Sequence, residues 1–128
     1  MPPLVELLGD ANEGVAGAAA QALEAIRSGE AVEPLLRVLA EGRPEAQRLA
    51  ADLLGKLGDT RAAGPLTQAL ASGDRGVREA AVWALGEVGD GGALGPLAQA
   101  LLDSDVAVRQ RAGEAIDRLS QRLDAARP

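Results

Sequence analysis

The sequence predicts an all-α fold, a right-handed solenoid of four stacked helical hairpins of 31 residues each. The first observation is compositional: apolar residues make up 47% of the chain, mainly Ala, Leu and Val, of which Ala and Leu are strong helix formers. The second is a repeat, because a proline followed by leucine recurs in steps of 31 residues, at Pro3, Pro34, Pro65 and Pro96. We therefore expect a single domain over residues 1–128, with repeats at about 3–33, 34–64, 65–95 and 96–128.

A short helix is expected to open each repeat at its proline. The missing N–H of proline would have no intrahelical partner at the first helical position, so proline is well tolerated there. In the third repeat this helix is expected from Pro65 to Ala71, with Leu66, Ala69 and Leu70 on one apolar face.

A longer helix is expected to follow a polar turn, at about 76–88 in the third repeat. Asp74 and Asp105 are placed to cap the N-termini of two of these helices, and Pro44 fits the first position of another. The spacing i, i+4, i+7, i+8, i+11 predicts one buried stripe, which in the third repeat consists of Val77, Ala81, Ala84, Leu85 and Val88.

The pairs Gly58-Asp59 and Gly89-Asp90 indicate where the longer helices stop, because glycine commonly follows the last helical turn. One hairpin cannot bury its apolar stripe alone, whereas stacked hairpins can, so the repeat predicts a solenoid.

The two ends of the array are expected to differ. The last repeat extends its second helix, and Gln121, Arg122 and Asp124 are expected to cover that end with polar groups. The first repeat has no such cover. Its exposed apolar residues are therefore expected to support a homo-oligomer, through Leu4, Leu7, Leu8 and Val15.

The composition also narrows the chemistry. The chain has no Cys and no His, which removes disulfides, thiolates and the usual general base. The net charge of −6 disfavours a nucleic-acid partner. No apolar run is long enough to cross a membrane, and the N-terminus lacks the pattern of a signal peptide. We expect a cytoplasmic protein with no catalytic residues, cofactor, metal site, nucleic-acid partner or membrane partner.

Residues 77–90, VREAAVWALGEVGD, resemble the HEAT-like repeats of the phycocyanobilin (PBS) lyase type, whose core has the pattern V-R-x-x-A-A-x-A-L-G-x-I-G-D. The match is good at 46–59, partial at 108–120 and loose at 15–28. The resemblance implies that the second helices line a concave groove. It also implies that the Arg and Asp of the pattern tie adjacent repeats together, here Arg78, Arg109, Asp59 and Asp90.

Trp83, the only aromatic residue of the chain, is expected to point into this groove. Residues four apart share a helix face, so Glu79 and Glu87 are expected above and below the ring, and Asp52 and Glu114 beside it. An exposed ring in a groove is typical of a binding hot spot. The remaining groove residues are expected to be Arg48, Lys56, Gln110 and Arg118.

Both features have an alternative. The alternative to the groove interpretation, which we favour, is that the Trp83 ring fills a gap left by Ala-rich packing, since Trp is usually mostly buried. The groove charges lie in lateral register with alternating sign, which favours surface ion pairs between repeats over a role in recognition. The aligned residues are Lys56, Glu87 and Arg118, and also Arg48 and Glu79.

The resulting hypothesis is a non-enzymatic scaffold that binds a protein or peptide of basic or apolar character in the groove. Two alternatives stay open. The resemblance implies a subunit of a bilin lyase or a tetrapyrrole-binding protein, although the chain offers no Cys or His for such chemistry. The unbroken register and bare first repeat also fit an excised or engineered repeat array without an activity of its own.

Overall fold

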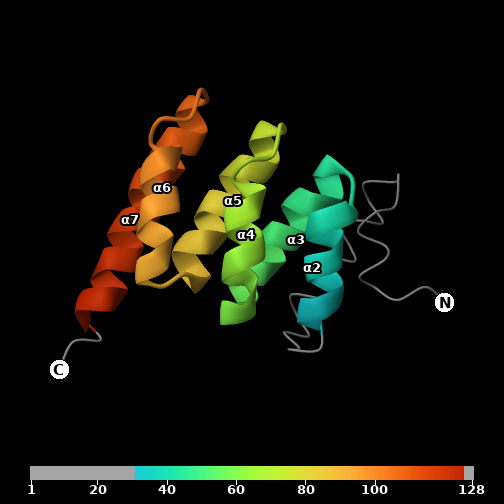
Figure 1. Ribbon diagram of the computed structural model, residues 1–128, viewed down its shortest axis with the longest axis horizontal. Helices are drawn as coiled ribbons and strands as arrows, with labels where there is room; N and C mark the ends of the chain where they lie inside the picture. The colour runs from blue at the N-terminus through green and yellow to red at the C-terminus, as the bar shows by residue number, and fades with distance from the viewer. Residues whose placement is uncertain (1–30, 126–128) are drawn as a thin grey trace.

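The computed structural model describes residues 31–125 of the chain (Figure 1). The expectations for the first repeat, including its apolar end and self-association, lie outside the described residues, and the boundaries of the single domain stay a prediction. Within the described part there is no strand, and no helix is long and apolar enough to cross a membrane. Its elements are α2 (Val32–Glu41), α3 (Pro44–Leu57), η3 (Thr60–Ala62), α4 (Ala63–Ala69), α5 (Arg75–Val88), η4 (Gly91–Ala93), α6 (Leu94–Ala100) and α7 (Val106–Ala125).

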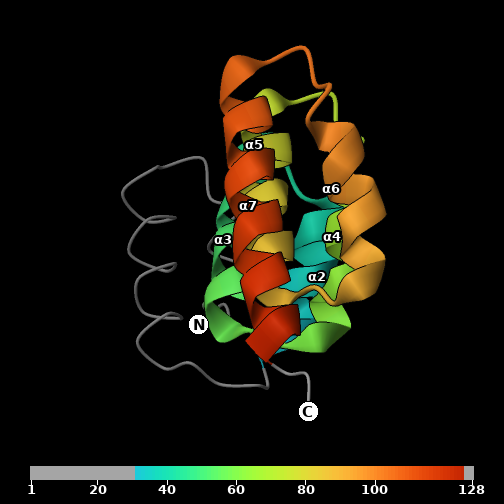
Figure 2. The same cartoon turned by 90° about the vertical axis from the view of Figure 1, so that its left-hand side faces the viewer.

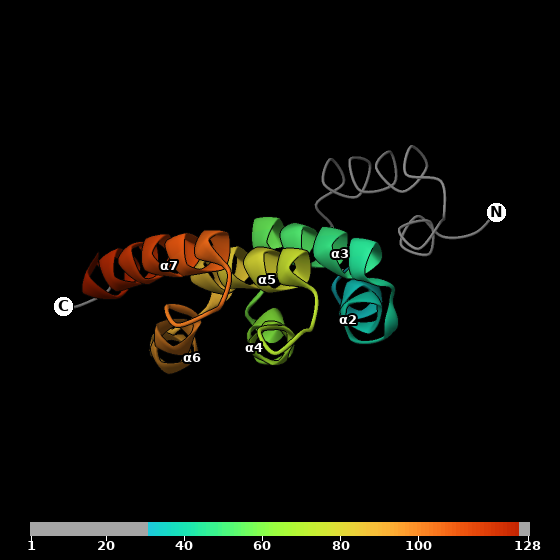
Figure 3. The same ribbon diagram turned by 90° about the horizontal axis from the view of Figure 1, so that it is seen from above.

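These elements form three hairpins, α2 with α3, α4 with α5 and α6 with α7, which stack in chain order. The long helices α3, α5 and α7 lie side by side in one layer, and the short helices α2, α4 and α6 form the other (Figures 2 and 3). The predicted all-α solenoid is therefore confirmed over the described residues.

The short helices begin before their prolines rather than at them. They start at Val32, Ala63 and Leu94, so each proline is the third helical residue. The position is tolerated because the N–H groups of the whole first turn lack intrahelical acceptors. The earlier start has a local cause in two repeats, where the Asp59 carboxylate accepts a hydrogen bond from the Arg61 N–H and the Asp90 carboxylate accepts one from the Gly92 N–H, both at 2.9 Å.

These two carboxylates were expected to tie adjacent repeats together, and that expectation is wrong for them. Each bonds within its own turn and opens the 3-10 helix that leads into the next short helix. The expectation holds for Arg78, which donates from Nε and Nη2 to the Asp103 carboxylate of the next hairpin, at 2.8 and 3.2 Å. The expectation is wrong for Arg109, whose bond to the Asp103 carbonyl, at 2.7 Å, lies within its own hairpin.

The caps of the long helices agree with the sequence. The Asp74 carboxylate accepts from the Val77 N–H at 3.0 Å, and the Asp105 carboxylate accepts from the N–H groups of residues 107 and 108. The two glycine stops differ from each other. Gly58 has φ +69°, whereas Gly89 has φ −74° and needs its small size, because a Cβ there would lie 2.6 Å from the Leu85 carbonyl oxygen.

The predicted stripe of α5 is buried in full, from Val77 to Val88. Small residues bring the long helices close together along this core. A Cβ at Gly55 of α3 would lie 2.9 Å from the Ala84 Cα of α5, and a Cβ at Gly86 of α5 would lie 2.7 Å from the Ala115 Cβ of α7. The two contacts are one repeat apart, so the 31-residue register sets the spacing of the stack.

A side chain near the end of α7 contacts the preceding hairpin. The Arg122 guanidinium donates to the carbonyl oxygens of Gly86, Glu87 and Gly89 at the C-terminus of α5. Those carbonyls carry the negative end of the helix dipole, where a cation is stabilising. Arg122 therefore joins two hairpins, whereas the sequence suggested that it would cover the end of the array.

Candidate binding pocket

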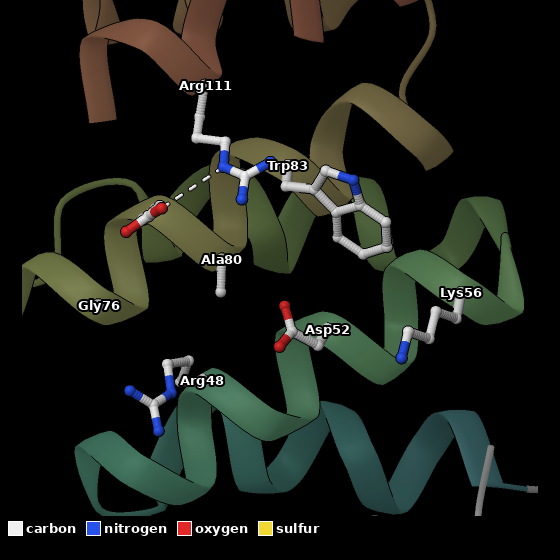
Figure 4. Close-up of a pocket in the computed structure, with 8 residues that line it drawn as sticks. Arg48, Asp52, Lys56, Gly76, Ala80, Trp83 and Arg111 are labelled. Atoms are coloured by element: carbon white, nitrogen blue, oxygen red, sulfur yellow. Dashed lines mark hydrogen bonds and ion pairs between the residues drawn. The ribbon is translucent and has the colours of Figure 1, made fainter. Parts of the chain in front are cut away.

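A pocket of about 340 Å³ lies on the layer of long helices (Figure 4). We call it the Trp83 pocket. Helix α3 contributes three charged side chains, α5 contributes four of the lining residues, and α7 contributes a single arginine. Its lining residues are Arg48, Asp52, Lys56, Gly76, Glu79, Ala80, Trp83 and Arg111.

Trp83 connects this pocket to the core. The side chain is half-buried and packs against the hydrophobic core, and its ring lies over Gly55 of α3. A Cβ at Gly55 would lie 2.6 Å from Cζ3 of the ring, so only glycine leaves room for it. The two sequence interpretations each describe one part of this arrangement, because the ring fills a gap between α3 and α5 and also lines the pocket.

Asp52 is half-buried in the pocket and points into the same space as Trp83 (Figure 4). Among residues 31–125, no group donates a hydrogen bond to its carboxylate and no cation lies within ion-pair distance of it. Burial raises the pKa of the Asp52 carboxyl above its ordinary value, and the charge of Glu79 adds to the rise. The cations of the pocket act in the opposite direction without cancelling this rise, namely Lys56, Arg48 and Arg111.

Arg111 is the pocket residue that sequence reasoning missed. Its Nε lies 3.4 Å from Glu79 Oε1, and its Nη1 lies 3.7 Å from Glu114 Oε2. The equivalent positions of the two preceding repeats are Leu49 and Ala80, so the register gave no indication of a charged wall. Only its position one residue from Gln110, on the long helix of the last repeat, was a signal for it.

The other predicted groove residues lie outside the pocket. Glu87 and Arg118 form an ion pair between α5 and α7, with 3.2 Å between Oε1 and Nε, although the arginine lacks hydrogen-bond alignment. This pair matches the predicted lateral register. Glu114 lies beside the pocket and binds Arg111, and Gln110 is exposed on α7 without lining it. The predicted pairing of Arg48 with Glu79 is absent, because Glu79 turns to Arg111 instead.

Two other hollows of the described structure lie between neighbouring short helices, with volumes of about 570 and 310 Å³. Their linings are related by the repeat: Pro65 and Val77 line one, and Pro96 and Val108, 31 residues later, line the other. Because their linings recur with the repeat, these hollows follow from the stacking of the hairpins. The Trp83 pocket depends instead on side chains that differ between repeats, so we take it as the candidate site.

No three His, Cys, Asp or Glu side chains between residues 31 and 125 come close enough together to hold a metal ion. The acidic residues of the turns serve as helix caps, as the hydrogen bonds of Asp74 and Asp105 show. The Trp83 pocket itself offers charged groups, hydrogen-bonding groups and one aromatic ring.

Solved structures with the same architecture include an engineered protein, at a TM-score of 0.66 and 25% identity over 92% of this chain and 61% of that one. The complex of CpcE and CpcF of phycocyanin lyase from Nostoc sp. PCC7120 has a TM-score of 0.61 and 22% identity, over 94% of this chain and 66% of that one. The chain thus spans less than two thirds of either, and the second likeness shows the fold alone. No protein of curated function matches the chain.

Family models give a more direct assignment. The model described as PBS lyase HEAT-like repeat matches residues 15–41, and the model described as HEAT repeats matches residues 32–117. The resemblance inferred from residues 77–90 is therefore confirmed. Because the second match covers more than half of the sequence, the chain belongs to the HEAT repeat family.

Proposed function

We propose that the protein is a non-enzymatic binding module that holds a segment of a partner protein or peptide in the Trp83 pocket. This proposal rests on two residues that line the same pocket. Trp83 is the chain's only aromatic residue, and the Asp52 carboxylate has no hydrogen-bond donor among the described residues. A polar group that is half-buried and unsatisfied costs stability. A partner that supplies the missing donor turns this cost into binding free energy.

The surroundings of the ring support the same function. Trp is enriched at the centres of interfaces, where a rigid ring gives a large contact area at little cost in conformational entropy. The packing of Trp83 over Gly55 fixes the ring from one side and leaves another side facing the pocket. Stacked helical repeats characteristically present one face as an extended binding surface.

The first test uses Trp83 as its own probe, since the chain has no Tyr and no Phe. A half-buried ring is expected to show an emission maximum between those of buried and free indole, with partial quenching by acrylamide. A random-sequence peptide display library is then selected on the protein. Selected peptides are expected to shift the Trp83 emission and to protect the ring from acrylamide.

A variant and a matched control decide whether the pocket is the site. Trp83→Leu keeps an apolar side chain over Gly55 and is expected to weaken peptide binding at least tenfold by calorimetry. Gln99→Ala changes an exposed residue on the layer of short helices and is expected to leave binding unchanged. Peptides that bind Trp83→Leu as tightly as the unmodified protein would overturn the proposal.

A second candidate function rests on the match of residues 15–41 to the PBS lyase HEAT-like repeat, namely a subunit of a bilin lyase or a tetrapyrrole-binding protein. Titration with a bilin tests it directly. A shift in the visible absorption of the bilin, together with quenching of Trp83, would favour this candidate. An unchanged bilin spectrum at high protein concentration would remove it.

A further inference from the structure

The charges of the Trp83 pocket are unequally satisfied. Arg111 is held between Glu79 and Glu114, so most of its charge is balanced within the protein. Arg48 and Lys56 also line the pocket, and both side chains are exposed, so solvent screens their charges. Asp52 alone combines partial burial with the absence of any donor among the described residues. An occupant of the pocket therefore gains most by bringing a hydrogen-bond donor to Asp52.

The shape of the site favours a flat donor. Asp52 and Trp83 come from facing helices and point into one space (Figure 4). A guanidinium group is planar, stacks on an aromatic ring and offers two parallel N–H groups to a carboxylate. A charged donor makes a stronger hydrogen bond to a carboxylate than a neutral amide does. The pocket volume, about 340 Å³, is at the lower end of the range for small-molecule sites and suits one long side chain.

From this arrangement we infer that the partner inserts an arginine side chain, which stacks on Trp83 and donates to Asp52. The inference rests on the proposed function and specifies its ligand. The opposing charges do not forbid it. Arg111 is balanced by two glutamates. Arg48 and Lys56 are exposed, so water and salt screen their repulsion of an arginine.

The remaining repulsion between Arg48 and an inserted arginine means that two substitutions should change the affinity in opposite directions. Replacing Asp52 by Asn removes the negative charge and one of the two acceptor oxygens, and it is expected to weaken arginine binding at least tenfold. Neutralising Arg48 removes a like charge and is expected to strengthen it. An anionic ligand would produce the opposite response to both substitutions, so the two variants together report the charge of the occupant.

The probe is a blocked pentapeptide with one central arginine between glycines, followed by Trp83 fluorescence and by the indole N–H signal in NMR. We expect saturable changes that are lost with the citrulline peptide, which keeps the shape without the charge. We expect at least tenfold weaker binding for Asp52→Asn and two- to threefold tighter binding for Arg48→Met. Gln110→Ala is the matched control, because it changes an exposed long-helix residue outside the pocket.

Ionisation supplies a further readout. Arginine binding is expected to weaken on acidification as Asp52 becomes protonated in its setting of Arg48, Lys56, Glu79 and Arg111. Equal binding of the arginine and citrulline peptides, or tighter binding of a glutamate peptide that Arg48→Met removes, would overturn the inference. Library peptides that need Trp83 but contain no basic residue would also overturn it while leaving the proposed function standing.

Discussion

The two junctions between long helices have the same backbone packing and different surfaces. At both, a glycine meets an alanine of the next helix, Gly55 with Ala84 and Gly86 with Ala115. The α5–α7 junction is closed by charge pairs between its helices, Glu79 with Arg111 and Glu87 with Arg118, and by Arg122 on the end of α5. The α3–α5 junction has Trp83 over its glycine and leaves Asp52 without a donor among residues 31–125.

This difference separates the residues that build the stack from those that give it a surface. Small residues at fixed register bring the helices together at either junction. The polar groups above these small residues are either paired within the protein or left for another molecule. Which of the two occurs depends on three positions one repeat apart, occupied by Asp52, Trp83 and Glu114. Substitutions at the two junctions should therefore separate stability from recognition.

The largest expected effect is at Arg78, which links α5 to the last hairpin. Both side chains of its pair with Asp103 are mostly buried, with exposed fractions of 16% and 13%. Arg78→Met leaves the carboxylate without this partner and is expected to cost about 2–3 kcal/mol in urea unfolding. Arg109→Met, the equivalent substitution one repeat later, removes one exposed bond and is expected to cost less than about 1 kcal/mol.

This loss should depend on pH. Burial alone would raise the pKa of Asp103, but hydrogen bonds from the Asp105 N–H and from Arg78 hold it below the ordinary value of 3.8. A lowered pKa stabilises the fold above pH 3.8, and this contribution disappears as the pH falls through the folded-state value. The gap between Arg78→Met and the unmodified protein should thus narrow on acidification. A gap that is constant with pH would show that the ion pair is not its source.

The next effect is steric. A Cβ at Gly86 would lie 2.7 Å from the Ala115 Cβ, so Gly86→Ala should force α5 and α7 apart and cost about 1–2 kcal/mol. Gly113→Ala is the control, because the nearest atom to its Cβ would be Leu101 Cδ2 at 3.9 Å. That variant is expected to gain up to about 1 kcal/mol from helix propensity. Equal thermal midpoints for the two variants would show that close approach of α5 and α7 does not require glycine at position 86.

At the α3–α5 junction, the substitution Asp52→Asn is expected to raise the free energy of unfolding instead of lowering it. Because burial raises the folded-state pKa of Asp52 above 3.8, its contribution to stability is present below that pH and is lost as the pH rises through the folded-state value. Asp52→Asn should therefore be more stable than the unmodified protein at pH 7, by less than about 1 kcal/mol, and equal to it at pH 3. The exposed Asp117→Asn controls for the change in net charge. A destabilised Asp52→Asn at pH 7 would mean that the carboxylate is already satisfied.

The smallest effect is expected at the surface pair. Glu87 and Arg118 are 35% and 37% exposed, so Glu87→Gln should change the unfolding free energy by less than about 0.5 kcal/mol. The effect should also shrink in high salt. A loss above 1 kcal/mol in chemical denaturation would show that the closed junction depends on its charges as well as on its glycine.

Much of the fold follows from the sequence, and the reasons are specific. The proline-leucine register and the stripe from Val77 to Val88 predicted stacked hairpins, because one hairpin cannot bury its stripe alone. The starts of the short helices were misplaced, because Asp59 and Asp90 open a 3-10 turn that outweighs the proline signal. In the site, Arg111 was missed, because the register equates it with Leu49 and Ala80 and only its position beside Gln110 indicated it.

The bonds of Arg122 bear on how the array comes apart. In a linear stack each repeat is held only by its neighbours, so a terminal hairpin is normally the first to fray. Here the last helix is fastened to the carbonyls of Gly86, Glu87 and Gly89, which belong to the hairpin before it. Release of the last hairpin must therefore expose the C-terminus of α5 as well. The two hairpins should exchange their amide protons as one cooperative unit.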